Sequence, residues 1–185
     1  MTTFPVDVVY AWVDGSDPAW LEKKRRVLAE QEGRHTSEEV SGEGRFRNNG
    51  ELRYSVRSVL KFAPWIRRIF IVTDDQVPGW LDTSSPRVEI VDHADIFEDT
   101  SLLPIFSARA IEMRLSHIEG LSEHFLYFND DYFLGRPTSI DNFFHRSGMG
   151  KLFPGPRLRR TFPGRLLLDS AVKKDNPHRH AVHNS

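Results

Sequence analysis

The stretch VDVVYAWVDGSDPAW, residues 6–20, carries a strand, a turn and a helix start in one short run. Its first part, residues 6–13, is an almost continuous series of apolar and β-branched residues, which is typical of a strand buried on both faces. Asp17 followed by Pro18 has the order of a helix N-cap and a first helical position. The stretch therefore predicts a buried β-strand that leads through a short turn into a helix.

Strand and helix patterns continue to alternate along the chain. Runs at residues 67–76, 87–93 and 124–129 predict three more strands, and apolar residues at helical spacing predict helices at 52–63 and 107–118. Few hairpin signals interrupt this order, which favours an α/β domain with a mostly parallel sheet and flanking helices. For the helix at 52–63, Asn49 is a candidate cap and Pro64 a stop signal.

The segments that fit neither pattern are polar. Residues 33–44 are rich in Gly, Ser and charged residues and predict a loop. We expect residues 1–150 to form the folded core, and residues 151–185 to form an extended or partly disordered tail. The histidines at 178, 180 and 183 lie in this polar tail, where disorder is a better interpretation than a metal cluster.

Composition limits the classes of function. The chain has 185 residues, 39% hydrophobic and 28% charged, which suits one globular domain with its own core. A formal net charge of -1 argues against nucleic acid as a partner. The absence of cysteine excludes thiol chemistry and fits a reducing compartment. With neither a transmembrane run nor a signal-peptide pattern in the sequence, we expect a cytoplasmic protein.

Carboxylates follow three of the predicted strands. Asp14 ends the first, Asp74 and Asp75 end the second, and Asp130 and Asp131 end the last. Because the carboxyl ends of parallel strands line one crevice where ligands bind, these side chains should converge. Turn formation and helix capping are the alternative interpretation of each one. Adjacent carboxylates repel each other, so the Asp130–Asp131 pair favours a bound cation or a shifted pKa.

An oxygen-only ligand set predicts a hard cation, Mg²⁺ or Mn²⁺, rather than zinc. Mg²⁺ usually sits between one or two carboxylates and the phosphates of a substrate, which points to a nucleotide or sugar-phosphate ligand. Arg45, Arg47, Arg53 and Arg57 supply guanidinium groups suited to phosphate. A solvated basic face is the other interpretation of these arginines.

Two further residues stay open on sequence alone. Glu112 lies at the edge of the apolar stripe of the helix predicted at 107–118. It is either an exposed surface residue or a general base near the crevice. His93 follows a predicted strand, and it either lines the crevice or has a structural role.

Longer motifs in the chain resemble a known family. DVVYAWVDGSDPAW (residues 7–20) resembles the first conserved region of the Stealth family. Three stretches resemble its second region: RFRNNGELRYSVRSVLKFAPWIRRIFIVTDDQVPGWL (45–81), PRVEIVDHADIF (86–97) and LPIFSARAIEMRLSHIEGLSEHFLYFNDDYFLG (103–135). The resemblance covers residues 6 to about 145. It implies that residues 1–150 form a catalytic core that binds a nucleotide-sugar, and that residues 151–185 begin a C-terminal half.

The resemblance implies a Rossmann-like fold similar to glycosyltransferase-A enzymes. It also implies transfer of a hexose- or N-acetylhexosamine-1-phosphate from a nucleotide-sugar, expected to be UDP-linked, to a glycan hydroxyl in capsule or exopolysaccharide synthesis. Such a protein would be cytoplasmic or peripheral to the membrane-bound polysaccharide machinery. Two alternatives stay open: a metal-dependent glycosyltransferase that releases a nucleoside diphosphate, and a non-catalytic module that binds a nucleotide-sugar.

The resemblance also implies roles for single residues. By position, Glu112 and Asp131 match the catalytic residues of the family's AIE and NDD motifs. Asp130 joins Asp131 as an expected metal ligand. The residues expected to bind substrate or phosphate are Asp14, Asp17, Arg45, Asn49, Arg53 and Asp74.

The chain departs from the family pattern in three places. The family has Asp where this chain has Asn48, and Gly where it has Asp75. The family's third and fourth regions, which contribute a His and an Arg to the active site, are expected beyond the second region and have no counterpart before Ser185.

Overall fold

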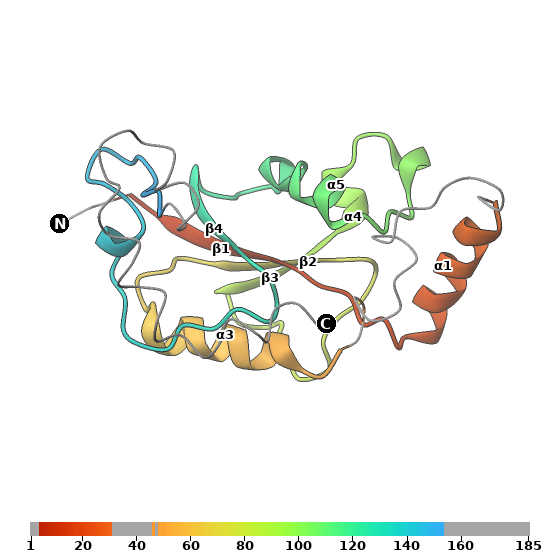
Figure 1. Cartoon of the computed structure of the whole chain (residues 1–185), viewed down its shortest axis with the longest axis horizontal. Helices are drawn as coiled ribbons and strands as arrows, with labels where there is room; N and C mark the ends of the chain where they lie inside the picture. The colour runs from red at the N-terminus through yellow and green to blue at the C-terminus, as the bar shows by residue number, and fades with distance from the viewer. Residues whose placement is uncertain (1–3, 31–45, 47, 154–185) are drawn as a thin grey trace, which may run out of the picture. The chain divides into compact units, whose positions relative to one another are not determined.

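The computed structural model describes residues 4–30, 46 and 48–153. Their core is a four-stranded parallel sheet with the order β3-β2-β1-β4 (Figure 1). The strands are β1 (Val6–Ala11), β2 (Ile69–Thr73), β3 (Val88–Asp92) and β4 (His124–Phe128). The predicted α/β class and Rossmann-like arrangement are therefore confirmed, with a strand inside each predicted run.

Strand β1 occupies an inner position, which explains its apolar sequence. It pairs with β2 on one side and with β4 on the other, with Ala11 opposite Val72 and Tyr10 opposite Phe128. This register brings the carboxyl ends of the three strands to one edge of the sheet, where polar residues follow each of them.

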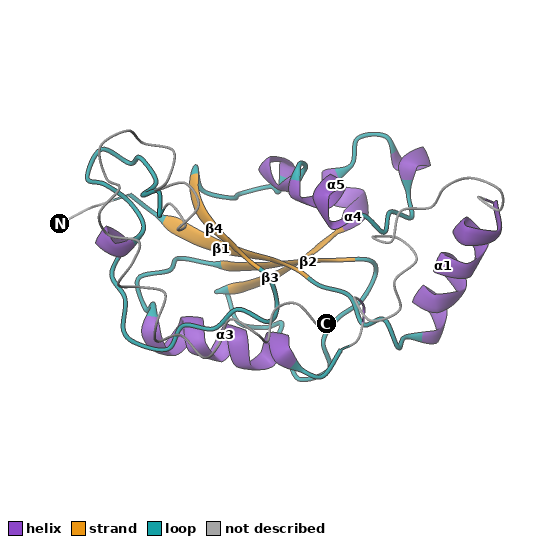
Figure 2. Ribbon diagram, in the orientation of Figure 1, coloured by secondary structure: helices purple, strands orange, loops and turns teal. Residues whose placement is uncertain are grey.

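Helices cover both faces of the sheet (Figure 2). Helix α3 (Glu51–Phe62) lies on one face, while α4 (His93–Ile96) and α5 (Ala108–Glu112) lie on the other. Alternate residues of a strand point to opposite faces, so Val8 packs in the core on the α3 side and Val9 in the core on the α4 and α5 side. Short 3₁₀ helices span η2 (Thr100–Leu102), η3 (Leu115–His117) and η4 (Ile140–Asn142).

Helix α1 (Pro18–Glu30) begins where the sequence predicts. The Asp17 carboxylate accepts a hydrogen bond from the Trp20 amide at 2.8 Å, so Asp17 does cap this helix. Helix α3 departs from the prediction at its start. Its N-cap is Gly50, whose φ of 83° lies in the left-handed region, and Asn49 does not cap it.

The helix predicted at residues 107–118 is shorter than expected. Helix α5 ends at Glu112, and the chain continues as the 3₁₀ turn η3. The predicted apolar stripe is still buried, because Ile111, Leu115 and Ile118 all pack in the core on this face. Burial of the stripe therefore does not require a continuous helix.

A buried carboxylate fixes the amino end of β1. Asp7 is fully buried and accepts hydrogen bonds from Arg67 Nε at 2.9 Å, from the Arg68 amide at 3.1 Å and from the Ser122 amide at 2.8 Å. Burial opposes the charge, but the hydrogen bonds from Arg67 and Ser122 outweigh it and lower the pKa of Asp7. Asp7 thus joins β1 to the segments that lead into β2 and β4.

Other expectations lie outside the described residues. The loop predicted at 33–44 and nearly all of the tail predicted at 151–185 stay predictions. Within residues 4–30, 46 and 48–153, no helix has the length and apolar character needed to cross a membrane.

Candidate functional site

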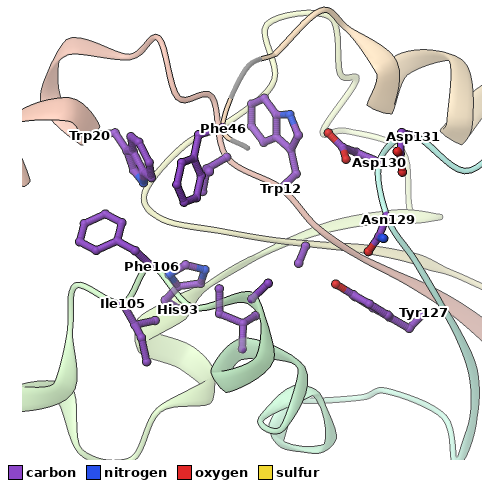
Figure 3. Close-up of a pocket in the computed structure, with 14 residues that line it drawn as sticks. Trp12, Trp20, Phe46, His93, Ile105, Phe106, Tyr127, Asn129, Asp130 and Asp131 are labelled. Carbon is purple, nitrogen blue, oxygen red and sulfur yellow. The ribbon is translucent and has the colours of Figure 1, made fainter. Parts of the chain in front are cut away.

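A pocket of about 320 Å³ lies at the carboxyl ends of β1, β3 and β4 (Figure 3). We call it the main pocket. Aromatic residues form one part of its wall and the residues of the NDD motif form another. Its lining consists of Ala11, Trp12, Val13, Trp20, Phe46, His93, Ile105, Phe106, Ala108, Ile111, Tyr127, Asn129, Asp130 and Asp131.

The aromatic wall is built from three separate segments. The Trp20 ring packs 4.9 Å from Phe46 and 5.3 Å from Phe106, measured between ring centroids. Phe46 is fixed by its backbone, because the Gly15 amide donates to the Phe46 carbonyl at 2.9 Å. A Cβ atom on Gly15 would lie 2.0 Å from that carbonyl oxygen, so only glycine allows this approach.

The carboxylate wall follows β4. Asn129, Asp130 and Asp131 form a turn in which the Tyr132 amide donates to the Asn129 carbonyl at 3.1 Å. Asp130 is half-buried, and its pKa is raised by burial and by the negative charges of Asp131 and Glu51. This part of the pocket therefore holds an excess of negative charge.

Two serines of α3 hold this turn against the helix. Ser55 donates to the Tyr132 carbonyl, and the Tyr10 hydroxyl lies 2.8 Å from Ser55 Oγ and can donate to it. Ser58 Oγ accepts from the Leu134 amide at 2.9 Å. Because Ser55 and Ser58 are one helical turn apart, they align the segment after the NDD motif along α3.

Tyr127 connects Glu112 to the main pocket. Its hydroxyl forms a hydrogen bond with the Glu112 side chain, and Figure 3 shows the hydroxyl inside the main pocket. Burial and the charges of Glu112 and Asp130 raise the pKa of Tyr127, so the hydroxyl stays protonated and donates. Glu112 itself is exposed on α5, and the Tyr127 contact places its carboxylate beside the pocket.

Asp14 and Asp17 lie at a different place. They line a second pocket, of about 270 Å³, that shares Trp12 with the main pocket. Both oxygens of Asp14 are engaged, Oδ1 by the Ser16 amide at 2.9 Å and Oδ2 by Asn48 Nδ2 at 3.1 Å. The remaining residues of this second pocket are Asn48, Asp75, Gln76, Val77, Pro78, Gly79 and Trp80.

The two single-residue departures from the family pattern both lie at this second pocket. Asn48 donates to Asp14 and also accepts from the Gly50 amide at 3.0 Å, and an ionised Asp at this position could not donate to Asp14. Asp75 has a φ of 54°, the left-handed conformation that favours the glycine of the family pattern.

Asp74 is buried directly after the end of β2. Its Oδ1 accepts an ion-pair hydrogen bond from Lys23 Nζ at 3.0 Å, while its Oδ2 has no hydrogen-bond partner among the described residues. The Asp74 charge also acts on His93, which follows β3 and lines the main pocket.

Asp74 lines neither pocket, and the same holds for two other predicted binding residues, Asn49 and Arg53. Both are exposed, and Asn49 Nδ2 instead donates to Glu51 Oε1 at 2.7 Å. Arg45 lies outside the described residues, as does Arg47. The main pocket thus brings together Asp130 and Asp131, while Glu112 interacts with Tyr127 of the same lining.

The carboxylate wall fits a Mg²⁺-type cation that is shared with a ligand. In the described part of the chain, no three Asp, Glu or His side chains come together as a complete metal cage. Asp130 and Asp131 instead offer the one or two carboxylates that Mg²⁺ uses together with substrate phosphates. Burial, together with the charges of Asp131 and Glu51, raises the pKa of Asp130, and a bound cation would offset these effects.

Sequence reasoning missed the aromatic side chains of the main pocket. Trp12 follows β1 directly and Tyr127 lies near the end of β4, so both occupy the strand-end region that identified the carboxylates. A search of the strand ends for every residue type would have found these two. Trp20, Phe46 and Phe106 come from outside the sheet, and only tertiary packing brings them together.

Comparison with known proteins gives the same two regions as the sequence motifs. Stealth protein CR1, conserved region 1, matches residues 4–32, and Stealth protein CR2, conserved region 2, matches residues 45–152. The second match alone covers more than half of the chain and includes the NDD and AIE motifs.

Curated relatives are similar over most of the chain. An exopolysaccharide phosphotransferase of Streptomyces coelicolor is 51% identical over 156 residues, which is 84% of this chain and 25% of the relative. The capsular polysaccharide phosphotransferase LcbA of Aeromonas hydrophila is 43% identical over 150 residues, 81% of this chain and 41% of the relative. A capsular polysaccharide phosphotransferase of Haemophilus influenzae is 44% identical over 154 residues, which is 82% of this chain and 41% of the relative.

The chain therefore spans between about a quarter and two fifths of the length of these relatives. Both regions matched within it are Stealth regions, and together with the identities to these relatives they show that the chain belongs to the Stealth family.

Proposed function

We propose that this chain carries the donor-binding part and catalytic carboxylates of a sugar-1-phosphate transferase that acts in capsule or exopolysaccharide synthesis. The observation that carries the proposal is the main pocket, where a carboxylate wall and an aromatic wall meet at the carboxyl ends of the sheet. The relatives named as polysaccharide phosphotransferases support the same reaction class.

The donor would be a nucleotide-sugar, expected to be UDP-linked. Its uncharged rings suit the aromatic wall, and its diphosphate suits the carboxylate wall through a shared cation. Asp130 and Asp131 would hold Mg²⁺ or Mn²⁺, which when bound neutralises charge on the diphosphate and on the group being transferred. Asp14 and Asp17 would contact a different part of the donor at the second pocket.

The reaction is a substitution at the phosphorus that carries the sugar. A glycan hydroxyl attacks this phosphorus, its proton passes to the carboxylate of Glu112 or Asp131, and the bond to the bridging oxygen breaks. A phosphodiester forms between sugar and glycan, and a nucleoside monophosphate leaves. Tyr127, by donating to Glu112, holds that carboxylate beside the pocket.

We further propose that the protein works in the cytoplasm, next to the machinery that extends the polysaccharide. A glycan acceptor follows from the polysaccharide named for the relatives. Arg53, which is exposed and lines neither described pocket, would meet the phosphates or the acceptor, and we expect the same role for Arg45.

The test is a screen of nucleotide-sugars with this chain, Mg²⁺ or Mn²⁺ and an oligosaccharide acceptor. We expect one donor to give nucleoside monophosphate in a metal-dependent way. Release of nucleoside diphosphate would instead identify a glycosyltransferase. Donor binding without any turnover, restored by the remaining length of a relative, would identify a binding module and refute catalysis by this chain.

A further inference from the structure

Among the described residues, four buried side-chain atoms have no hydrogen-bond partner, and all four lie at one edge of the sheet. They belong to residues at or just after the ends of β1, β2 and β3. Folded proteins satisfy more than nine tenths of their buried polar groups with protein, water or ligand. The atoms are Trp12 Nε1, Thr73 Oγ1, Asp74 Oδ2 and His93 Nδ1.

Two of these residues line the main pocket. His93 is 2% exposed and Trp12 is 7% exposed, so neither has open access to bulk water. Figure 3 shows His93 close to Phe46 and Phe106, with Tyr127 and the NDD carboxylates at the other side of the pocket. The histidine therefore belongs to the aromatic part of the pocket rather than to the carboxylate wall.

The imidazole of His93 is neutral at physiological pH. Burial lowers its pKa, and the charge of Lys23 acts in the same direction, while the charges of Asp74 and Asp92 oppose both without reversing the shift. A neutral imidazole carries one donor and one acceptor, so it recognises uncharged polar groups rather than phosphate. Trp12 adds an indole N–H, which can only donate.

We propose that His93 Nδ1, together with Trp12 Nε1, recognises the uncharged ring of the donor that lies against the aromatic wall. The ligand class is a flat or chair-shaped ring with polar edge groups, either the nucleobase or the sugar of a nucleotide-sugar. This inference rests on the proposed function for its ligand. It makes His93 a specificity-determining residue of the site.

The alternative is a structural role for His93, either in starting α4 or in filling space. His93 is the first residue of α4, and Asp92 before it already caps that short helix by accepting from the Ala94 amide at 2.8 Å. The helix start therefore does not need the His93 side chain. If the imidazole only filled space, an apolar side chain of similar size would replace it without loss of binding.

The test compares three variants of the full chain. His93→Asn keeps an amide group near the position of Nδ1, His93→Gln places its amide near that of Nε2, and His93→Leu fills the space without a polar group. Titration calorimetry with Mg²⁺ would measure the affinities for UDP and for UDP-N-acetylglucosamine. Thermal melting of each variant controls for folding.

We expect His93→Leu and His93→Gln to bind about tenfold or more weakly, and His93→Asn to stay within about threefold of the parent chain, a difference that one hydrogen bond to a buried group explains. Weakened binding of both probes assigns the ring to the nucleobase. Weakened binding of UDP-N-acetylglucosamine alone assigns it to the sugar.

Equal affinities for His93→Leu and the parent chain would overturn the inference, as would equal losses in all three folded variants. Should His93→Leu fail to fold, the comparison of His93→Asn with His93→Gln is enough to show whether a polar group at the position of Nδ1 is needed for binding. If the parent chain binds neither these probes nor the nucleotide-sugars of the screen, both proposals fall. If it binds a donor that it does not turn over, the proposed catalysis fails while the His93 result stands.

Discussion

Asp7 lies in β1 and Asp130 in the turn after the neighbouring strand β4, and their pKa values move in opposite directions. Both are desolvated, which raises the pKa of a carboxyl group. At Asp7, hydrogen bonds from Arg67 and Ser122 outweigh this effect. At Asp130, no cation compensates within the described residues, and the charges of Asp131 and Glu51 add to the effect of burial. The first is a structural carboxylate, whereas the second has the electrostatics of a binding site.

The Asp7 network gives a pH-dependent stability. The folded-state pKa of Asp7 is lowered below its ordinary 3.8, so its contribution is complete well above pH 3.8 and is lost as the pH falls through the lowered value. Asp7→Asn should lower the free energy of unfolding by about 3 kcal/mol at neutral pH. Urea unfolding of both proteins from pH 7 to pH 3 should show this difference shrinking. A difference that stays constant with pH would refute the role of the charge.

Asp131 and Glu112 are the residues on which the proposed chemistry depends. Asp131→Asn should remove metal-dependent turnover, and Glu112→Gln should lower the rate about 10²- to 10⁴-fold with little change in donor affinity. Rates and donor affinities would be measured together with far-ultraviolet circular dichroism. Asp141→Asn, an exposed carboxylate that lines neither pocket, is the control. Full activity of Asp131→Asn would exclude this residue from the mechanism.

The family pattern has glycine where this chain has Asp75, and substitutions at this position test whether backbone conformation favours the glycine. Its φ of 54° disfavours a side chain, so Asp75→Gly should stabilise the protein by up to about 1 kcal/mol. Asp75→Ala should instead destabilise it, because Ala adopts this conformation less readily than Asp. Chemical unfolding would measure both variants. If both variants changed the free energy of unfolding in the same direction, the side chain and not the backbone conformation would determine stability at this position.

Among the elements, strands were predicted better than helices. Each predicted strand contains an observed one, because a strand buried on both faces leaves an unbroken apolar run in the sequence. The helix at 107–118 was predicted too long, since a stripe at helical spacing is buried equally well by α5 and the 3₁₀ turn after it. The start of α3 was wrong by one residue because Gly50, not Asn49, adopts the cap conformation.

The turn between β1 and α1 supports the aromatic wall through Gly15. Gly15→Ala would place a Cβ atom 2.0 Å from the Phe46 carbonyl oxygen, so Phe46 must move away. We expect donor affinity to fall about tenfold, equivalent to about 1.4 kcal/mol, and the melting temperature to fall as well, because the clash is with backbone atoms. Gly135→Ala is the matched control, because a Cβ atom there meets nothing within 4 Å. Unchanged donor binding by Gly15→Ala would show that the Phe46 position is not needed.

At the level of the whole molecule, sheet topology explains what the sequence could predict about the site. A parallel sheet collects its strand ends at one edge, so Asp130, Asp131 and the general position of the pocket followed from pattern alone. The same rule placed Asp14 at the correct edge, but the structure puts it in the second pocket. The contact between Tyr127 and Glu112 joins residues from different elements, and the spacing of residues along the sequence does not predict it.

The most direct measurement follows the phosphate itself. The donor that turns over in the screen would be labelled with ³²P on the phosphate next to the sugar and incubated with this chain, metal and an oligosaccharide acceptor. We expect the label to enter the glycan product as a phosphodiester while unlabelled nucleoside monophosphate is released. Label that stays in a released nucleoside diphosphate, with an unlabelled glycan product, would refute transfer of the sugar-phosphate.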